Sequence, residues 1–544
     1  MKCIVQLFAA LGGMKGTLRE KLEAVRAAGF TRIEPCVSAK PIPSLGDSVW
    51  PLDGFCAAAR QAQEMGLRIA SAHLFGDDHL QHLDALKEAA KASGLKAWVL
   101  KVPRDTGELS LQQAAFRARA LAEAMEEIGV EVWLHSEDND IRTKAAGKTA
   151  YERMLDLCMG KVYAQVDVGW VLHGGEDPLR FLERNERRVR AVHYKDFAQG
   201  KDEDVTIGTG MLDCAAVFRF AWTRGIPQYL DQDHYAGDIP GELARVNAML
   251  SALPQDRSGS VSYLNVCDAE TGEVTVLAEY PGVVEAPNWM KTRDALICNR
   301  SGRLFLHDIA SGADEPVDTG MCDSCNNDHV LSPDEKEIGV SHMTRSEKGF
   351  TSHVFRVDMK TGTVRPVTEM SPSFLHGWSP DGSEMAYCAF RSEDGKRNVD
   401  VYAIPAQGGQ EVRLTHGEGY SDGPEYSPDG KYIWYNTTAS GLMQVWRMDR
   451  DGSNKVQMTK GERNNWFGHV SPDGKKVVYI SYEKDVLEPN EHLPNMPVEL
   501  WVMNADGTGA RRLVSLFGGQ GTINVNSWAP DSRRFAFVSY GTEK

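Results

Sequence analysis

The stretches YAQVDVGW (163–170) and VRAVHYKD (189–196) decide the fold of the first half of the chain. Each is a short apolar run that ends in a polar side chain, Asp167 in one and His193 in the other, and then gives way to a loop. A run of this length bounded by loop residues is typical of a buried parallel strand. The carboxyl ends of parallel strands meet at one edge of a sheet, so we expect Asp167 and His193 to be neighbours.

Runs of the same kind occur eight times before residue 254, and amphipathic stretches separate them. The runs are Cys3–Phe8, Arg32–Pro35, Arg68–Ala72, Ala97–Val102, Glu131–Leu134, Tyr163–Asp167, Val189–His193 and Gln228–Asp231. The amphipathic stretches include Leu18–Ala28, Leu111–Ile128 and Cys214–Arg224. Strands that alternate with helices predict a parallel sheet, and eight such units predict a (β/α)8 TIM barrel.

The second half of the chain is an internal repeat. The helical pattern stops at the polar joint PQDRSGS (254–260). A Ser-Pro-Asp-Gly turn or a near variant then recurs, as LSPDE (331–335), WSPDG (378–382), YSPDG (426–430), VSPDG (470–474) and WAPDS (528–532), with a degenerate first copy NWMKTRD (288–294). Six markers, each followed by strand patterns, predict a six-bladed β-propeller. We therefore predict a barrel over 1–254, a linker over 255–259 and a propeller over 260–544.

The sixth blade is truncated in the sequence order, because only one strand, Arg534–Tyr540, follows its marker. The segment Ser260–Tyr280 precedes the first blade and has the pattern strand, Glu-Thr-Gly turn, strand. We expect this segment to complete the last blade, which would close the ring and leave no open sheet edge.

The first domain resembles the xylose-isomerase-like barrels called sugar phosphate isomerases/epimerases. The motifs that carry the resemblance are DVGW (167–170), GEDP (175–178), RAVHYKD (190–196), IGTGMLD (207–213) and YLDQD (229–233). That family holds one divalent cation with an acid after strand five, an Asp after strand six, a His after strand seven and a Glu after strand eight. The resemblance implies Asp167 and His193 as ligands and Asp231 in place of the usual Glu.

The fourth ligand falls in the strand-five motif LHSEDND (134–140), which departs from the family pattern. Strand alternation aims His135 and Glu137 to the same side. Glu137 is our first choice as ligand, His135 the second and Asp140 a third. Mixed carboxylate and imidazole donors suit Mn, Mg, Co or Zn, so we expect one divalent metal ion as the cofactor.

A metal that chelates a carbonyl and its neighbouring hydroxyl acidifies the adjacent C–H and stabilises an enediolate, and a general base then removes the proton. The predicted function is therefore a sugar isomerase or epimerase acting on a keto sugar or glycoside. The residues predicted to act in catalysis are Glu137, His73, Asp231 and Lys195. Those predicted to contact substrate are Glu34, His135, Trp170 and His376.

The second domain resembles the six-bladed TolB-like propellers with PD40-type turns. Polar residues precede its innermost strands, among them His329, His376, Glu425 and His469. Such residues line the channel mouth and could form a second metal or sugar site.

Three other functions remain open. A close variant is a lyase that cleaves 3-keto-glycosides by β-elimination, because that reaction shares the first proton abstraction. A second is a non-catalytic carbohydrate-binding protein, and a third places a polysaccharide lyase in the propeller. Each has a carbohydrate or glycoside as its small-molecule partner.

Composition excludes several classes of partner. The formal net charge of −16 argues against nucleic acid, whose phosphates favour a basic surface. No apolar run reaches the roughly 18 residues of a membrane helix, so we expect no membrane partner. The ten cysteines are spread thinly, as in reduced proteins, and we expect a cytoplasmic protein. A homo-oligomer is left open.

Overall fold

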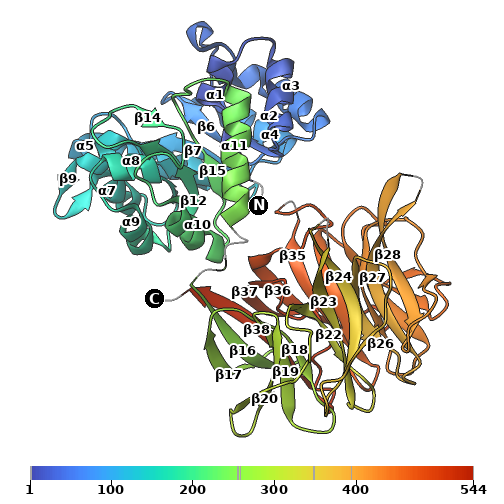
Figure 1. Cartoon of the computed structure of the whole chain (residues 1–544). Helices are drawn as coiled ribbons and strands as arrows, with labels where there is room; N and C mark the ends of the chain where they lie inside the picture. Colours follow the sequence, from blue (N-terminus) through green and yellow to red (C-terminus); the bar gives the residue numbers. More distant parts are fainter. Residues whose placement is uncertain are drawn as a thin grey trace. The chain divides into compact units, whose positions relative to one another are not determined.

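The computed structural model describes residues 3–253, 257, 259–346, 349–393, 395–484 and 486–542. The chain divides into two compact units, Met1–Leu253 and Pro254–Lys544 (Figure 1). The predicted linker 255–259 falls largely on positions 255, 256 and 258, which lie outside the described residues.

A curled parallel sheet forms the centre of the first unit. Its strands are β1 (Ile4–Gln6), β2 (Arg32–Glu34), β3 (Cys36–Ser38), β4 (Val49–Pro51), β5 (Arg68–Ile69), β6 (Ser71–Phe75), β7 (Ala97–Lys101), β8 (Glu131–His135), β11 (Tyr163–Asp167), β12 (Val189–Tyr194) and β15 (Gln228–Leu230). Two short hairpins lie outside it: β9 (Lys144–Ala145) with β10 (Lys148–Thr149), and β13 (Asp196–Phe197) with β14 (Asp204–Val205).

Two of the predicted strands are each broken into a pair. β2 and β3 are separated at Pro35, and β5 and β6 at Ala70. β2 pairs with β5 and β3 with β6, while β1 pairs with both β2 and β15. The parallel pairings therefore form one continuous curled sheet whose edge strands are β4 and β5, and the shared strand direction brings the carboxyl ends of the strands to one side.

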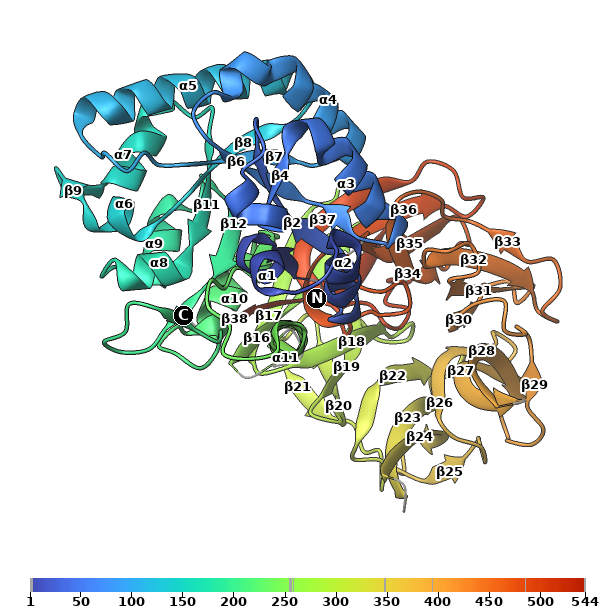
Figure 2. The ribbon, with the colours of Figure 1, turned by 90° about the horizontal axis from the view of Figure 1, so that it is seen from above.

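Helices follow the strands as the alternating pattern predicts. They are α1 (Phe8–Gly13), α2 (Leu18–Ala27), α3 (Leu52–Glu64), α4 (Leu83–Ser93), α5 (Glu108–Glu126), α6 (Asp138–Arg142), α7 (Ala150–Leu157), α8 (Val168–His173), α9 (Pro178–Asn185), α10 (Cys214–Thr223) and α11 (Ile239–Ala252). Figure 2 shows α3, α4, α5 and α7 on the outside of β6, β7 and β8. Side chains of Thr17, Thr149, Asp177, Asp213 and Asp238 cap the helices that they precede by accepting backbone N–H bonds.

Both faces of the sheet are buried, which explains the continuous apolar runs. Val5, Leu134 and Val166 pack into the core under the helices, while Ile4 and Val99 belong to a smaller apolar cluster. The first strand is shorter than predicted. It ends at Gln6, whose side-chain oxygen accepts a bond from the Phe8 N–H at 2.7 Å and so starts α1.

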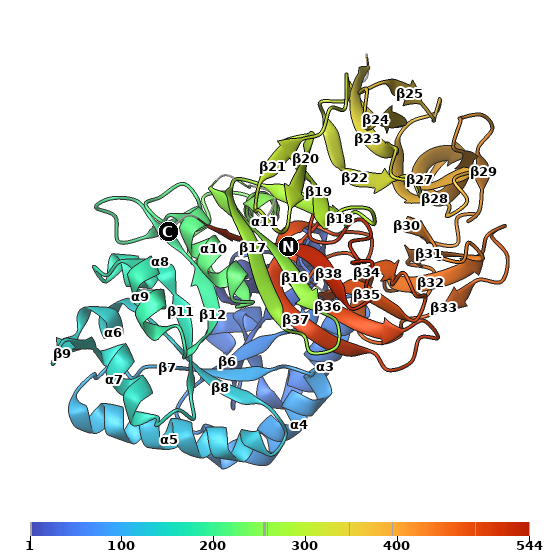
Figure 3. The ribbon, with the colours of Figure 1, turned by 90° about the horizontal axis from the view of Figure 1, so that it is seen from below.

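The second unit is a six-bladed propeller, as predicted (Figure 3). Five blades are four-stranded antiparallel sheets: β18 (Val284–Trp289) to β21 (Asp314–Pro316) through β19 (Ala295–Arg300) and β20 (Arg303–Asp308); β22 (Cys325–Leu331), β23 (Glu337–Ser346), β24 (Gly349–Asp358) and β25 (Val364–Pro366); β26 (Ser373–Trp378), β27 (Glu384–Glu393), β28 (Lys396–Pro405) and β29 (Val412–Arg413); β30 (Ser421–Tyr426), β31 (Tyr432–Thr437), β32 (Gln444–Asp449) and β33 (Val456–Gln457); and β34 (Arg463–Val470), β35 (Lys476–Glu483), β36 (Pro494–Asn504) and β37 (Arg511–Gly519).

The sixth blade joins the two ends of the unit. β38 (Arg534–Thr542) pairs with β16 (Ser260–Asp268), which pairs with β17 (Val274–Pro281). The register runs from Ser260 opposite Thr542 to Asp268 opposite Arg534. A bridge between Trp528 and Phe535 adds the innermost position. The first strands of the unit thus complete its last blade.

The repeated turn has the same hydrogen bonds in four blades. In the copy at 332–337, the Ser332 hydroxyl donates to Asp334 and accepts from the N–H of Glu337. The copies that begin at Ser379, Ser427 and Ser471 repeat both bonds. The motif is therefore architectural, because it fixes the turn between the first and second strands.

A register shift interrupts the innermost strand of five blades. The shifts lie between Glu285 and Asn288, Cys325 and His329, Leu375 and Gly377, Asp422 and Glu425, and Trp466 and His469. A β-bulge re-aims the side chains around it. These bulges therefore re-orient polar side chains at corresponding positions of the innermost strands.

Candidate metal centre

Four side chains meet at the carboxyl ends of four neighbouring strands of the first unit. His135 ends β8, Asp167 ends β11, His193 lies near the end of β12 and Asp231 follows β15. One potential ligand atom from each lies within 4.8 Å of the others. Asp167 and His193, which the sequence predicts as neighbours, are opposite each other in the β11–β12 register.

His135 is oriented by a chain of hydrogen bonds that begins at Glu34. The Gln165 amide donates to Oε1 of Glu34 at 2.8 Å, so its carbonyl oxygen faces the other way. That oxygen lies 3.1 Å from Nδ1 of His135. A carbonyl only accepts, so Nδ1 carries the proton and Nε2 keeps its lone pair. This is the arrangement by which a carbonyl orients a metal-binding imidazole.

Glu34 lies beneath two imidazoles in a fully buried position. Its Oε2 is 3.2 Å from Nε2 of His73 and 3.0 Å from Nε2 of His193. Burial alone would raise the pKa of Glu34, but the two imidazoles hold it well below its usual value. The three imidazole rings of His73, His135 and His193 also pack together, with centroids 4.9 to 5.8 Å apart.

The ionisable groups at the centre shift one another's pKa values. Burial opposes protonation of His193, but Glu34 and Asp231 raise its pKa to about 9. Burial lowers the pKa of His135 far below the usual value, with His193 and His73 adding to the effect, so its imidazole is neutral. Burial would raise the pKa of Asp231, but Lys195 and His193 keep it well below the usual value.

Asp167 offers a donor that the protein leaves unused. One oxygen, Oδ1, accepts from the N–H groups of Gly169 and Trp170 and so caps α8. The other, Oδ2, is buried without a hydrogen-bond partner among the described residues. Burial raises the pKa of Asp167 to about 8, against the lowering effect of Lys195. Burying a carboxylate oxygen without a partner costs free energy of folding, and a divalent cation beside it would offset that cost. The residues therefore fit a metal ion.

Lys195 lies at the rim of the group. Its ammonium is 3.5 Å from Asp231, 4.0 Å from Asp167 and 2.5 Å from Asp233. Burial opposes its charge, but these carboxylates raise its pKa well above the usual value, so it holds its proton throughout the neutral range. The ammonium also lies 5.2 Å from the centre of the Trp170 ring. That ring is half-buried against Phe197 at 5.0 Å.

Glu137, the first choice for the strand-five ligand, lies elsewhere. β8 ends at His135, and Glu137 is already the N-cap of α6. Its carboxylate is half-exposed and ion-paired with Lys101. Asp140 is buried but accepts bonds from the Glu137 N–H at 3.0 and 3.1 Å. The second choice, His135, takes the place that Glu137 was predicted to fill.

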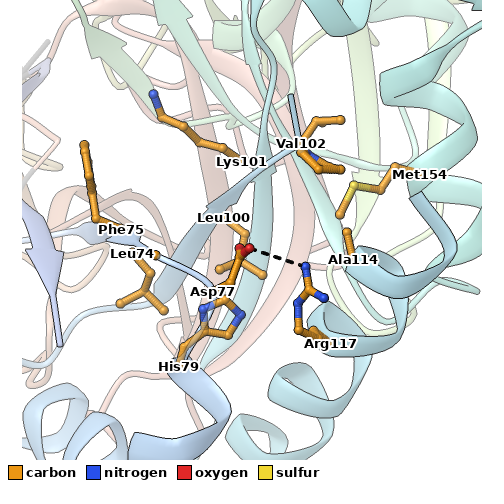
Figure 4. Close-up of a pocket in the computed structure, with 12 residues that line it drawn as sticks. Leu74, Phe75, Asp77, His79, Leu100, Lys101, Val102, Ala114, Arg117 and Met154 are labelled. Carbon is orange, nitrogen blue, oxygen red and sulfur yellow. Dashed lines mark ion pairs between the residues drawn. The ribbon is translucent and has the colours of Figure 1, made fainter. Parts of the chain in front are cut away.

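Access to the centre is narrow. Asp167 and His193 are fully buried and His135 is 3% exposed, while Asp231 is 8% exposed. A separate pocket of about 170 Å³ lies at the ends of β6 and β7. Figure 4 shows Arg117 pointing toward Asp77 across it, and their side chains are 3.7 Å apart. None of the four clustered residues is among those that line it.

The polar residues predicted for the propeller channel serve different purposes. Glu425 accepts from the Val470 N–H and from Asn526, and lies 2.6 Å from Nδ1 of His469, so these residues tie blades together. His329 is fully buried, and its Nε2 lies 3.3 Å from the Ile297 carbonyl oxygen. His376, predicted to contact substrate, is 3.2 Å from Asp422 and also lines a cavity.

Two members of the site were not predicted. Gln165 lies two residues before Asp167, so strand alternation places both on one face. Asp233 lies two residues after Asp231 and pairs with Lys195. Spacing alone could have suggested Gln165, whereas the position of Asp233 depends on the loop after β15.

Comparisons with known proteins separate the two halves. The family description TolB beta propeller domain (PD40) matches residues 332–496. An uncharacterized protein of Agrobacterium fabrum is 38% identical over 298 residues, which are 54% of this chain and 98% of that protein. The solved structure of a candidate TolB from Agrobacterium tumefaciens is 39% identical and covers 52% of this chain and 99% of its own, with a TM-score of 0.49.

The N-terminal half matches other folds. A sugar phosphate isomerase/epimerase from Parabacteroides distasonis is 18% identical and covers 46% of this chain and 96% of its own, with a TM-score of 0.40. Among the described residues, no helix combines the length and apolar character needed to cross a bilayer.

Proposed function

The C-terminal half of the chain belongs to the TolB-like β-propeller family, and we propose that the N-terminal half is a metal-dependent enzyme. Its site would hold one divalent cation and would act on a keto sugar or glycoside by moving a proton next to the carbonyl. The observation that carries the proposal is the approach of four ligand atoms to within 4.8 Å of one another.

The ligands in this proposal are His135, Asp167, His193 and Asp231, and the ion is Mn, Mg, Co or Zn. Two imidazoles with two carboxylates are a donor set that such ions accept. When bound, the cation would polarise a carbonyl oxygen and make the adjacent C–H more acidic. Binding requires His193 to give up a proton, because its two ring nitrogens face Asp231 and Glu34 at 3.1 and 3.0 Å.

His73 is the side chain that we assign to accept the substrate proton. It is 2% exposed, belongs to the same group of imidazoles and lies against the buried Glu34 carboxylate. A carboxylate beside an imidazole stabilises the imidazolium that forms when the proton arrives. Return of the proton to another carbon or face gives isomerisation or epimerisation, and loss of a β-substituent gives elimination.

Lys195 is the side chain that we assign to a substrate oxygen. It keeps its proton, and it lies beside Asp231, the ligand with the greatest exposure. The half-buried Trp170 ring beneath the ammonium limits its freedom. A fixed ammonium stabilises negative charge that develops on an oxygen during enolisation.

Metal analysis and proton exchange test the proposal together. The full chain should carry close to one equivalent of metal in the barrel, and Asp167→Asn should lose it. Asp177→Asn, which removes a carboxylate that caps α9, is the matched control and should retain the metal. With metal bound, the protein should exchange deuterium from solvent into one member of a panel of ketoses and 3-keto-glycosides, read by NMR.

The outcomes separate the alternatives. Exchange with loss of the aglycone identifies the β-elimination lyase, and exchange without it identifies an isomerase or epimerase. Sugar binding without exchange identifies a carbohydrate-binding protein and overturns the proposed enzyme. A fully loaded protein that neither binds nor exchanges any sugar in the panel also overturns it.

A reducing compartment suits the chain. All ten cysteines lie in the described part of the protein, and all are free thiols. Eight of them are buried, as is common for reduced proteins. We therefore place the proposed enzyme in the cytoplasm, which localisation of a tagged chain would check.

A further inference from the structure

A second group of metal-binding side chains lies within the propeller, far along the sequence from the first. His376 on β26, Cys388 on β27 and Asp422 on β30 each offer a ligand atom, and these atoms lie within 4.8 Å of one another. All three residues are buried, and Nε2 of His376 is 3.2 Å from Oδ1 of Asp422. The group joins two neighbouring blades.

The bulges of the innermost strands create this group. His376 is the residue that the register skips between Leu375 and Gly377. Asp422 is the last paired residue before the shift in the next blade. In a regular strand one of two successive side chains would point to the opposite face, whereas a bulge re-aims it. The construction therefore directs an imidazole and a carboxylate to one point.

A second carboxylate faces the group from the preceding blade. Oδ1 of Asp328 lies 3.9 Å from Nε2 of His376. Asp328 is 4% exposed, and although its Oδ2 accepts from Asn326, Oδ1 has no hydrogen-bond partner among the described residues. An unused carboxylate oxygen this deeply buried is costly unless a cation lies beside it.

We propose that His376, Cys388 and Asp422 bind a Zn²⁺ ion, with Asp328 as the fourth donor. Nothing in the proposed barrel reaction requires this site. One nitrogen, one sulfur and carboxylate oxygens suit zinc in four-coordinate geometry. The thiolate disfavours Mg²⁺ and Ca²⁺, which prefer oxygen ligands. On binding, the Cys388 S–H bond breaks, a sulfur–zinc bond forms and the proton leaves to solvent.

A cavity reaches one member of the proposed site. His376 also lines a cavity of about 450 Å³ whose walls include Trp378, Tyr426 and Trp528. The site would link the innermost strands of three blades, from β22 through β26 to β30. Binding to the folded state alone would therefore stabilise the propeller.

Cobalt substitution tests the proposal without interference from the barrel. The barrel ligands include no cysteine, so a sulfur-to-cobalt charge-transfer band in the near ultraviolet separates a thiolate site from the barrel site. The full chain, stripped with a chelator and titrated with Co²⁺, should develop this band to saturation within about two equivalents, because the barrel ligands can take up one of them. Excess Zn²⁺ should then remove the band.

Variants identify the ligands. Cys388→Ser should abolish the band, and His376→Gln and Asp422→Asn should weaken cobalt binding at least about 10-fold. Cys325→Ser, a buried thiol on β22, is the matched control and should leave the band unchanged. Asp167→Asn should also leave it unchanged, so failure of the barrel proposal would not affect this one.

Two results would overturn the proposal. One is the absence of the band in the unmodified chain, a measurement that does not depend on whether any variant folds. The other is a band that persists in folded Cys388→Ser protein, which would assign the cobalt to a different thiol.

Discussion

Oε1 of Gln165 lies 3.1 Å from Nδ1 of His135, and this bond fixes which nitrogen of the imidazole is free. The orientation of Gln165 is itself fixed by its bond to Glu34. A residue that touches no metal in the proposed site thus determines whether His135 can act as a ligand.

Gln165→Leu should weaken metal binding by the barrel about 10- to 100-fold, the usual cost of losing a partner behind a metal-binding imidazole. Isothermal titration of the stripped chain with Mn²⁺ or Co²⁺ measures the effect. Gln228→Leu is the matched control. Gln228 is also buried, but it is the first residue of β15 and so lies at the amino end of that strand. Its side-chain oxygen accepts a hydrogen bond from the Tyr194 hydroxyl. Equal losses in the two variants would contradict the role of Gln165.

Lys195→Met should lower kcat by about 10²- to 10⁴-fold while the metal bound in the barrel stays close to one equivalent. The reason is that the lost ammonium is assigned to a substrate oxygen and is not a ligand. Lys161→Met, which removes an exposed ion pair with Glu126, is the control and should leave kcat unchanged. Loss of metal together with activity in Lys195→Met would show that the lysine supports the ligands instead.

Gly169→Ala should destabilise the first unit by about 1–3 kcal/mol, the usual cost of overpacking. A Cβ on Gly169 would lie 2.4 Å from the carbonyl oxygen of Lys195, so α8 and β12 cannot both keep their positions. Gly237→Ala provides the control, because nothing lies within 4 Å of its added Cβ. Chemical denaturation measures both variants, and equal midpoints would contradict the close approach.

The propeller should lose stability as the pH falls from 6.5 toward 4, because of His329. Burial lowers the pKa of this side chain from 6.5 to about 4. Between these values the unfolded chain binds a proton that the folded chain does not, so acid favours unfolding. The loss between pH 7 and pH 5 should be about 2 kcal/mol, at 1.36 kcal/mol for each pKa unit.

His329→Gln tests this assignment, since an amide can still donate to the Ile297 carbonyl but does not titrate. The difference in unfolding free energy between pH 7 and pH 5 should shrink by that amount in the variant. An unchanged pH dependence would assign the acid sensitivity to other groups.

Much of the fold follows from the sequence, because parallel strands buried on both faces leave continuous apolar runs. The propeller follows from its Ser-Pro-Asp-Gly turns, whose bonds recur in the four copies that begin with serine. The strand-five ligand could not be settled in this way. Alternation holds only while a strand continues, and β8 ends at His135, so the direction of Glu137 is set by α6.

The propeller group illustrates a second limit. His376 was predicted from its place before an innermost strand, but its neighbours Cys388 and Asp422 come from two other strands. Bulges of one or two residues decide which side chains meet, and no repeat period encodes them. Convergence in the barrel was easier to predict, because strand ends alone determine it.

The pairing of β16 with β38 has a consequence for biosynthesis. Ribosomes release a chain from its N-terminus, so the curled sheet has all of its strands once Leu230 has emerged. The propeller must instead wait for Arg534 and the residues after it, because β16 has no partner on that edge until then. While the other five blades are translated, the edge of β16 that will pair with β38 has no partner, and keeping it from pairing with other nascent strands is a task for chaperones.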